Sequence, residues 1–298
     1  MTIRITKESD TVIVERVNVC LYGAPGIGKT TIGFTADKPL LLDADEGAYR
    51  AKNRKDSVIV RAWKDVCDMD QSDLTPYNTI VVDTAGRMLD KLTSDIINGN
   101  PKMGRGGALT LQGYGELKAK FVSWMKMLNA FGKDVVLLCH MDEQRRGDDV
   151  IERLDVQGGS KGEIYKSVDA MGKIYIEQKK RLLDFSPREN AYGKNPGQFD
   201  VLTIPQPIPV DYLSDIIKGI KMSLNAVGEN QKKEQNLLTE WETAIADLKT
   251  VDDYNRLLIE AMKAPLAVKS LLHKSAKSHG FTYDKKLAVY TTKEGLFS

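Results

Sequence analysis

The stretch Gly23-Ala24-Pro25-Gly26-Ile27-Gly28-Lys29-Thr30 decides how this chain folds and what it binds. It fits the pattern G-x-x-x-x-G-K-[ST], which is typical of loops that hold the phosphates of a nucleotide. Glycines let consecutive backbone N–H groups turn inward onto a phosphate, and the lysine adds a positive charge that can reach the outer phosphates. The threonine offers its hydroxyl to magnesium. We therefore predict nucleotide binding by Gly23, Ala24, Pro25, Gly26, Ile27, Gly28, Lys29, Thr30 and Thr31.

The residues on either side of this loop favour a strand before it and a helix after it. Val17, Val19 and Leu21 alternate with their neighbours in the manner of a strand. The segment from Thr30 to Phe34 can open a helix whose N-terminal dipole also favours phosphate. The sequence thus predicts a strand, a phosphate-binding loop and a helix in succession.

Two further apolar runs end in carboxylates. The run that begins at Pro39 ends in Asp43, Asp45 and Glu46, and the run Thr79–Val82 ends in Asp83. Buried parallel strands deliver such groups to their C-terminal edge, where ligands bind in α/β proteins. Asp83 then has the form of a Walker B residue that holds magnesium, and the alternative is a cap for the helix that follows.

A fourth apolar run, from Asp134 to Cys139, ends in His140. It follows an amphipathic helical pattern that begins at Gly115, as expected for a helix packed on a sheet. Polar, glycine-containing segments, 98–115 and 141–162, interrupt this alternation and predict long loops at the strand ends. A hairpin is expected within 173–185, and Val201 to Ile204 can close the sheet.

Three prolines at 205, 207 and 209 predict a boundary, followed by a helix from Tyr212 to Leu224. Beyond it we expect a polar linker from Glu229 to Gln235 and then helices, one of which begins with a capping box at Thr250. The predicted domains are 1–224, a nucleotide-binding core, and 225–298, a small helical domain.

Composition limits the class of protein. The chain has 298 residues with 42% hydrophobic and 28% charged residues, and no apolar stretch approaches the roughly 20 residues that span a bilayer. The N-terminus has no apolar signal block, so a soluble protein without a membrane partner is expected. Three widely spaced cysteines predict no zinc site. A net charge of +2 argues against a protein coated with positive charge, so any nucleic-acid contact must be local or repeated between subunits.

The order of these elements resembles the ATPase core of the RecA-like recombinases, and most of all the phage and prophage single-strand-annealing ATPases with a minimal RecA core. The resemblance covers about residues 15–205. It implies an α/β fold, a RecA-like P-loop NTPase with a mostly parallel central sheet flanked by helices, plus a small C-terminal all-α segment. The cofactors implied are ATP and Mg²⁺, with Thr30, Asp83 and Asp43 at the metal.

The same resemblance implies catalytic roles. Lys29 binds the outer phosphates, and Asp45 or Glu46 orients the attacking water, although the family usually has glutamate where Asp45 stands. His140 stands where the family's sensor is commonly glutamine, and the alternative is a strand-end histidine in an ordinary polar pocket. Arg188 and Lys194 match the region from which a neighbouring subunit contributes basic groups.

The two long loops resemble the family's paired DNA-binding loops. The residues expected to contact DNA there are Lys102, Arg105, Tyr114, Arg145, Arg146, Arg153 and Lys161. Basic side chains would neutralise phosphates and the tyrosine could stack a base, whereas the alternative is solvated loop charge. The implied partners are single-stranded DNA, further copies of the chain in a ring or filament, and a single-strand-binding protein, in the cytoplasm of a bacterial host.

The leading hypothesis is an ATP-hydrolysing recombination protein that oligomerises on single-stranded DNA and promotes annealing or strand exchange. One alternative is a P-loop phosphotransferase acting on a small acceptor, with Arg145 and Arg146 as lid residues. Another is a nucleotide-gated module that loads a second DNA-processing protein through the C-terminal helices.

Overall fold

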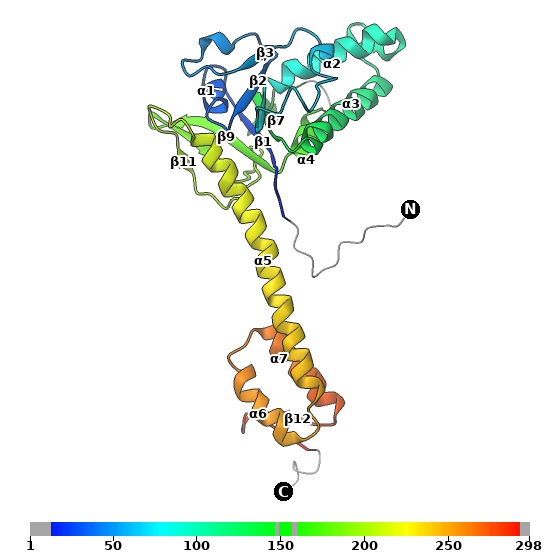
Figure 1. The fold of residues 1–298 in the computed structure, drawn as a ribbon, viewed down its shortest axis with the longest axis vertical. Helices are drawn as coiled ribbons and strands as arrows, with labels where there is room; N and C mark the ends of the chain where they lie inside the picture. The colour runs from blue at the N-terminus through cyan, green and yellow to red at the C-terminus, as the bar shows by residue number, and fades with distance from the viewer. Residues whose placement is uncertain (1–12, 147–148, 157–159, 293–298) are drawn as a thin grey trace. The chain divides into compact units, whose positions relative to one another are not determined.

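A computed structural model of the protein describes residues 13–146, 149–156 and 160–292 (Figure 1). The described residues form two compact units, Ile13–Asn225 and 226–292. The first unit contains the predicted phosphate-binding loop and is described first.

The first unit is built on a nine-stranded sheet in the order β11-β10-β9-β1-β7-β4-β2-β3, with β8 paired to β7. The strands are β1 (Asn18–Gly23), β2 (Pro39–Asp43), β3 (Ser57–Ile59), β4 (Thr79–Asp83), β7 (Asp134–Arg146), β8 (Asp149–Leu154), β9 (Ala170–Glu177), β10 (Lys180–Asp184) and β11 (Leu202–Thr203). Strands β9 to β3 along this order are parallel, and β10, β11 and β8 pair antiparallel. The expected α/β architecture with a mostly parallel central sheet is confirmed.

Helices cover both faces of the sheet, which explains why its inner strands are continuously apolar. Leu40 and Leu42 of β2 pack in one core with α2 (Ala85–Gly99) and α3 (Leu111–Ala130). Leu41 packs on the other face with α1 (Lys29–Gly33) and the first turns of α5 (Tyr212–Ala246). Alternate residues of each strand therefore enter opposite cores, and the strand ends are left to carry polar groups.

Register brings these polar ends together. Gly23 at the end of β1 is paired with His140 of β7, and Asp43 of β2 is paired with Asp83 of β4. Because β7 lies between β1 and β4, His140 stands between the phosphate-binding loop and the Walker B strand. The sheet thus places four chain segments, distant in sequence, at one edge.

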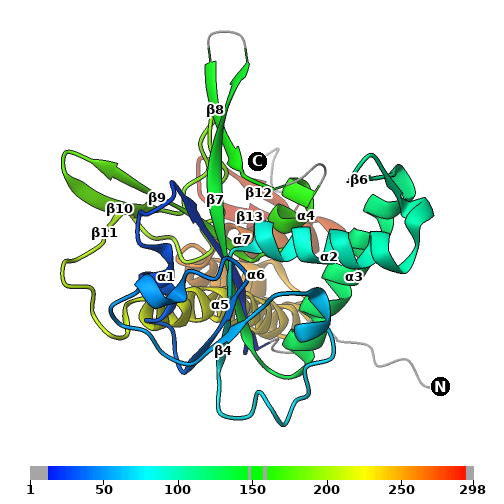
Figure 2. The same ribbon diagram turned by 90° about the horizontal axis from the view of Figure 1, so that it is seen from above.

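The two predicted loops have more regular structure than expected. The segment after α2 contains the short helix η3 (Pro101–Met103) and a small hairpin of β5 (Gly104–Arg105) and β6 (Ala108–Leu109). Strand β7 does not end at His140 but runs to Arg146 and pairs with β8, forming a two-stranded arm that projects beyond the sheet (Figure 2). Helix α4 (Ser160–Ser167) follows the arm.

Two other short helices lie near the sheet edge, η1 (Ala48–Arg50) after β2 and η2 (Trp63–Asp65) after β3. The predicted hairpin within 173–185 is confirmed as β9 and β10, and β11 extends the sheet as expected.

The second unit differs from its prediction in two ways. Helix α5 runs without a break from Tyr212 to Ala246, so the expected linker at 229–235 is helical. A hairpin of β12 (Thr282–Asp284) and β13 (Val289–Thr291) follows α6 (Val251–Ala261) and α7 (Leu266–Ser278), so the unit is not all-α. The capping box at Thr250 is confirmed, with Asp253 as its partner. No helix in the described part of the chain is long and apolar enough to cross a membrane.

Candidate functional site

The predicted phosphate-binding loop connects the end of β1 to the start of α1. Gly26 and Gly28 have φ angles of 76° and 96°, a left-handed backbone that residues with a Cβ rarely adopt. Gly28 directly precedes Lys29, the first residue of α1. The conformation of the loop therefore explains why glycine is needed at both positions.

Lys29 is buried beneath this loop. Its Nζ donates to the carbonyl oxygens of Gly23 and Ala24, each at 2.9 Å, and lies 3.2 Å from Nδ1 of His140. Burial lowers the pKa of Lys29, and the nearby carboxylates of Asp83 and Asp45 oppose this effect. The ammonium is held in place by neutral groups, so its charge remains available to a phosphate.

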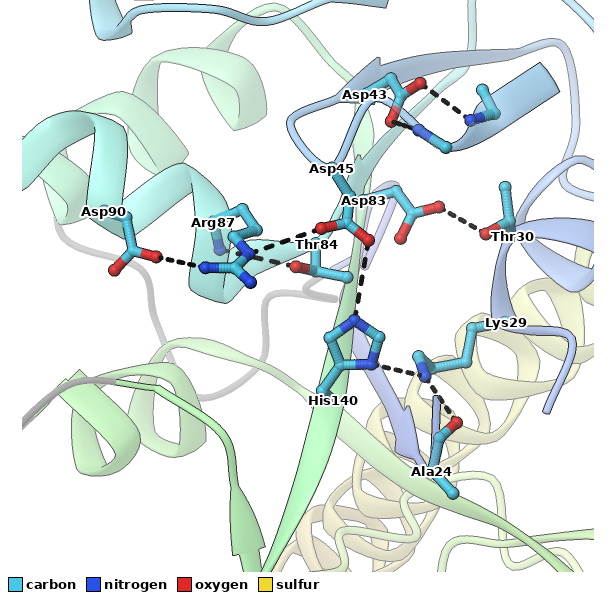
Figure 3. Close-up of polar contacts among 12 residues, drawn as sticks. Ala24, Lys29, Thr30, Asp43, Asp45, Asp83, Thr84, Arg87, Asp90 and His140 are labelled. Carbon is cyan, nitrogen blue, oxygen red and sulfur yellow. Dashed lines mark hydrogen bonds and ion pairs between the residues drawn. The ribbon is translucent and has the colours of Figure 1, made fainter. Parts of the chain in front are cut away.

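Thr30 and Asp83 form the second part of the site. The Thr30 hydroxyl donates to Oδ2 of Asp83 at 2.6 Å, which joins the loop to the end of β4 (Figure 3). Burial raises the pKa of Asp83 to about 6, and the neighbouring Asp43 adds to the rise, while the Thr30 bond and Lys29 oppose it. A buried carboxylate of this kind is stabilised by a nearby cation.

These oxygens fit magnesium. Mg²⁺ prefers oxygen ligands and is usually held by one or two protein groups together with the phosphates of a nucleotide and water. A hydroxyl and a buried carboxylate side by side next to a phosphate-binding loop supply such a set. Thr30 and Asp83, two of the three predicted ligands, are the residues that would hold the ion.

Asp45 lies on the opposite side of the site, between two basic side chains (Figure 3). Its Oδ1 is 3.5 Å from Nε of Arg87, and its Oδ2 is 3.8 Å from Nε2 of His140. The side chain borders the same cavity as Lys29 and Asp83. Its carboxylate can therefore approach a water molecule beside the outermost phosphate.

His140 connects Lys29 to Asp45. Burial and the charge of Lys29 lower the pKa of His140, while Asp45 raises it, so the imidazole is neutral near pH 7. An ammonium can only donate, so Nδ1 accepts from Lys29 and the ring proton is on Nε2, which faces Asp45. The role of His140 as a sensor stays a prediction, and the chain continues from it into the β7–β8 arm.

The neighbours of Asp45 have other surroundings. Asp43 accepts hydrogen bonds from the backbone N–H groups of Gly47 and Ala48 at 3.0 and 2.9 Å. It therefore holds the turn that carries Asp45, which differs from the role of metal ligand expected for it. Glu46 is exposed, with a φ of 53°, and does not border the cavity.

The cavity has a volume of about 330 Å³ and extends from the loop to Arg50 and Ala51 of the turn after β2. This size is within the usual range for small-ligand sites. Arg50 was not among the predicted site residues, and neither was Arg181 of β10, whose Nη1 donates to the carbonyl of Ile27 at 3.1 Å. The Arg181 guanidinium occupies the space where a Cβ on Gly28 would lie, so it supports the loop from within the same chain.

The residues expected to act on a neighbouring subunit are engaged within this chain. Nε of Arg188 donates to Asp184 at 2.9 Å, and the guanidinium lies 5.8 Å from the ring centre of Tyr175. Nζ of Lys194 donates to the carbonyl of Val168 at 2.8 Å and lies 4.7 Å from the ring centre of Tyr165. Both side chains thus have partners within their own chain, and their role toward a neighbouring subunit stays a prediction.

The residues expected to contact DNA lie in two places. Lys102 and Arg105 are exposed beside the small β5–β6 hairpin, and Arg145 is exposed on the β7–β8 arm. Tyr114 is half-buried in the first turn of α3, where it packs on the core. The side chains of Arg146 and Lys161 lie outside the described residues.

Arg153 has partners within the chain, and its contact with DNA stays a prediction. Its Nη1 donates to the carbonyl of Glu152 at 2.8 Å, and its guanidinium lies 4.7 Å from the ring centre of Tyr192. It thus packs against its own chain at the base of the arm, and Arg145 is the described arginine that the arm presents to solvent.

Comparison with known proteins identifies the family. No curated protein matches the sequence. Among solved structures, the KaiC-like protein PH0186 from Pyrococcus horikoshii OT3 is 12% identical, with a TM-score of 0.38 over 65% of this chain and 87% of that one. The flagellar accessory protein FlaH from Methanocaldococcus jannaschii is 11% identical, with a TM-score of 0.37 over 63% of this chain and 85% of that one. A family model described as an AAA domain matches residues 15–196, which contain the phosphate-binding loop, Asp45, Asp83 and His140. The chain therefore belongs to the AAA domain family AAA_24.

Proposed function

We propose that the protein is an ATP-hydrolysing recombination protein that assembles on single-stranded DNA and promotes annealing or strand exchange. The observation that carries the proposal is the position of His140. This residue touches Lys29 of the phosphate-binding loop and faces Asp45, and it directly precedes the part of β7 that forms the β7–β8 arm, where Arg145 is exposed. A single side chain therefore links the nucleotide site to an element with an exposed arginine that is able to contact a phosphate.

The hydrolytic part of the proposal follows from the site residues. Backbone N–H groups of the loop and the Lys29 ammonium bind the phosphates and stabilise charge that develops on the outermost one. Thr30 and Asp83 would hold Mg²⁺, which when bound neutralises phosphate charge. Asp45 accepts a hydrogen bond from the attacking water and orients it.

Asp45 is favoured over Glu46 as this group. Asp45 borders the cavity and has Arg87 and His140 at its two oxygens, whereas Glu46 is not among the residues that line the cavity. A general base needs to reach the water that it activates, and side-chain position decides this before pKa does.

The DNA part of the proposal rests on charge and on the resemblance to recombinases. Arg145 near the end of β7, Lys102 in η3 and Arg105 in β5 are exposed cations. A few such groups in each subunit form a continuous positive track when subunits repeat along a strand. Assembly into a ring or filament is therefore part of the proposal, and a single-strand-binding protein is a further proposed partner.

The test measures ATP hydrolysis by the full chain with and without single-stranded DNA, together with electron microscopy of the mixture. The proposal predicts release of inorganic phosphate, faster turnover with DNA, and rings or filaments. A protein that stays monomeric and hydrolyses ATP at the same rate with and without DNA contradicts the proposal. Transfer of the phosphoryl group to a small acceptor identifies a phosphotransferase instead.

A further inference from the structure

A second hollow lies along α2, next to the nucleotide cavity. It has a volume of about 580 Å³ and lies between the polar face of α2 and the turn at η2. Its charged lining residues are Arg61, Lys64, Arg87, Lys91, Asp90 and Asp95. We call this hollow the α2 groove.

The α2 groove has an excess of unpaired positive charge. Asp90 is 3.4 Å from Nη1 of Arg87, and Asp95 is 3.4 Å from Lys120, which stands outside the lining. Among the described residues, no carboxylate forms an ion pair with Arg61, Lys64 or Lys91.

One further acid, Asp65, offsets part of this excess. Asp65 accepts from the backbone N–H groups of Arg61 and Ala62, both at 2.8 Å, and its charge also acts on Lys64 and Arg61. With Asp65 counted, the four cations of the lining still outnumber three carboxylates around a space large enough for a ligand, and this excess suits an anion.

The groove is connected to the nucleotide site through Arg87. A smaller hollow of about 170 Å³ lies between the two and is bordered by Arg87, Asp90 and His140. Arg87 borders this hollow and the groove, and its Nε faces Asp45 at 3.5 Å (Figure 3). At the other end the groove reaches Asn98, close in sequence to Lys102 and Arg105.

We propose that the α2 groove binds the phosphates of single-stranded nucleic acid and that Arg87 couples this binding to Asp45. The proposal rests on the function proposed above and adds the route by which DNA stimulates hydrolysis. Without DNA, the guanidinium of Arg87 is shared between Asp45 and Asp90. A phosphate in the groove attracts Arg87 away from Asp45, whose carboxylate is then able to orient water.

The energy of this exchange is small enough for a ligand to drive it. The side chain of Arg87 is 62% exposed and that of Asp45 is 32% exposed, so their ion pair is screened by water. Loss of such a pair changes an equilibrium by at most about fivefold. Phosphate contacts by several groove cations together change the binding constant of nucleic acid by more than this factor.

The experiment compares the ratio of DNA-stimulated to basal turnover in full-length variants, with oligo-dT as the probe. A double variant, Lys64→Gln with Lys91→Gln, removes two groove cations. The matched control is Lys126→Gln with Lys249→Gln, two exposed lysines outside the groove. We expect the groove variant to lose most of its stimulation by DNA. The slope of its binding against salt, d log K/d log[salt], should decrease in magnitude by about 1.4, because two phosphate contacts are lost.

Arg87→Gln tests the coupling separately. Basal turnover should rise by up to about fivefold, because Asp45 is released. The ratio of DNA-stimulated to basal turnover should fall toward one. Arg87→Lys should restore part of the stimulation, which a purely structural role would not predict. The thermal midpoint of each variant verifies that it is folded.

The outcomes separate this inference from the proposed function. A wild-type chain that DNA neither binds nor stimulates contradicts the proposed function, and the groove proposal with it. A stimulated wild type whose groove variant matches the lysine control overturns the groove proposal alone, as does an Arg87→Gln variant with unchanged basal turnover and full stimulation.

Discussion

Asp45 and Glu46 are neighbours in the sequence, but the structure gives their side chains different surroundings. Asp45 borders the nucleotide cavity and Glu46 does not. We therefore predict that Asp45→Asn lowers kcat by about 100-fold or more with little change in ATP affinity, since loss of a general base acts on the chemical step. Glu46→Gln is the matched control and should keep turnover within about twofold of wild type. Steady-state kinetics with a nucleotide-binding assay measures both, and equal losses in the two variants would contradict the assignment.

The buried carboxylate of Asp83 leads to a prediction about the stability of the fold. Burial raises its pKa to about 6 from the usual 3.8, so the ionised carboxylate destabilises the nucleotide-free fold at pH 7, and this penalty is lost as the pH falls below 6. Asp83→Asn should increase the free energy of unfolding at pH 7 by on the order of 2 kcal/mol and abolish hydrolysis. Urea unfolding at pH 7 and pH 5 checks this, because the gain should shrink at the lower pH. A constant difference across this range would exclude the raised pKa.

Some of these residues could be predicted from sequence and others could not. Lys29, Thr30 and Asp83 are marked by a local motif or by a strand that ends in an acid. Arg87 has the appearance of any exposed charge on a helix, and only the approach of β2 and α2 brings it to Asp45. Arg181 is 154 positions from its partner Ile27, so no local pattern could reveal it.

The β7–β8 arm is the element that the sequence described least well. Beyond His140 the apolar run ends, because only Met141 and Leu154 at the base of the arm pack on the core. The backbone of the arm is nevertheless paired from Met141 with Leu154 to Arg146 with Asp149. The prediction of a linker at 229–235 was wrong for a different reason. Glutamate, glutamine and lysine favour helices, so a polar stretch without proline continued α5 instead of ending it.

The arm makes a prediction about nucleic-acid binding. Arg145→Gln should reduce the salt dependence of single-stranded DNA binding by about 0.7 in d log K/d log[salt], since one phosphate contact is lost. Glu143→Gln on the same strand is the control, and it should leave binding equal or stronger because it removes a negative charge. Fluorescence anisotropy across a salt series measures the slopes. Identical slopes for wild type and Arg145→Gln would remove this residue from the interface.

The N-terminal cap of helix α6 allows a test of the stability of the second unit. The side chain of Thr250 accepts from the backbone N–H of Asp253, and the carboxylate of Asp253 accepts from the backbone N–H of Thr250. Thr250→Ala should destabilise the C-terminal unit by about 1 kcal/mol. Hydrogen exchange of α6 would report the change, whereas exchange in the sheet of the first unit should stay the same. Protection of α6 that does not change would contradict the capping role.

For the whole molecule, all the residues of the nucleotide cavity lie within Ile13–Asn225. A chain that ends after Asn225 should therefore keep basal ATP hydrolysis within about threefold of the full chain, because it retains every group that touches the nucleotide. Comparison of DNA-stimulated turnover and assembly in the two chains then shows what the second unit contributes. Complete loss of ATP binding in a truncated chain that is still folded would show that the second unit is part of the site.

The central claim is that the loop from Gly23 to Thr30, with the ammonium of Lys29, binds and helps to cleave a nucleoside triphosphate. The most direct measurement is ATP affinity and turnover in Lys29→Ala, with circular dichroism as the test of folding. The account predicts a loss of turnover of about 100-fold or more together with weaker ATP binding. A folded Lys29→Ala protein with wild-type affinity and turnover would contradict it.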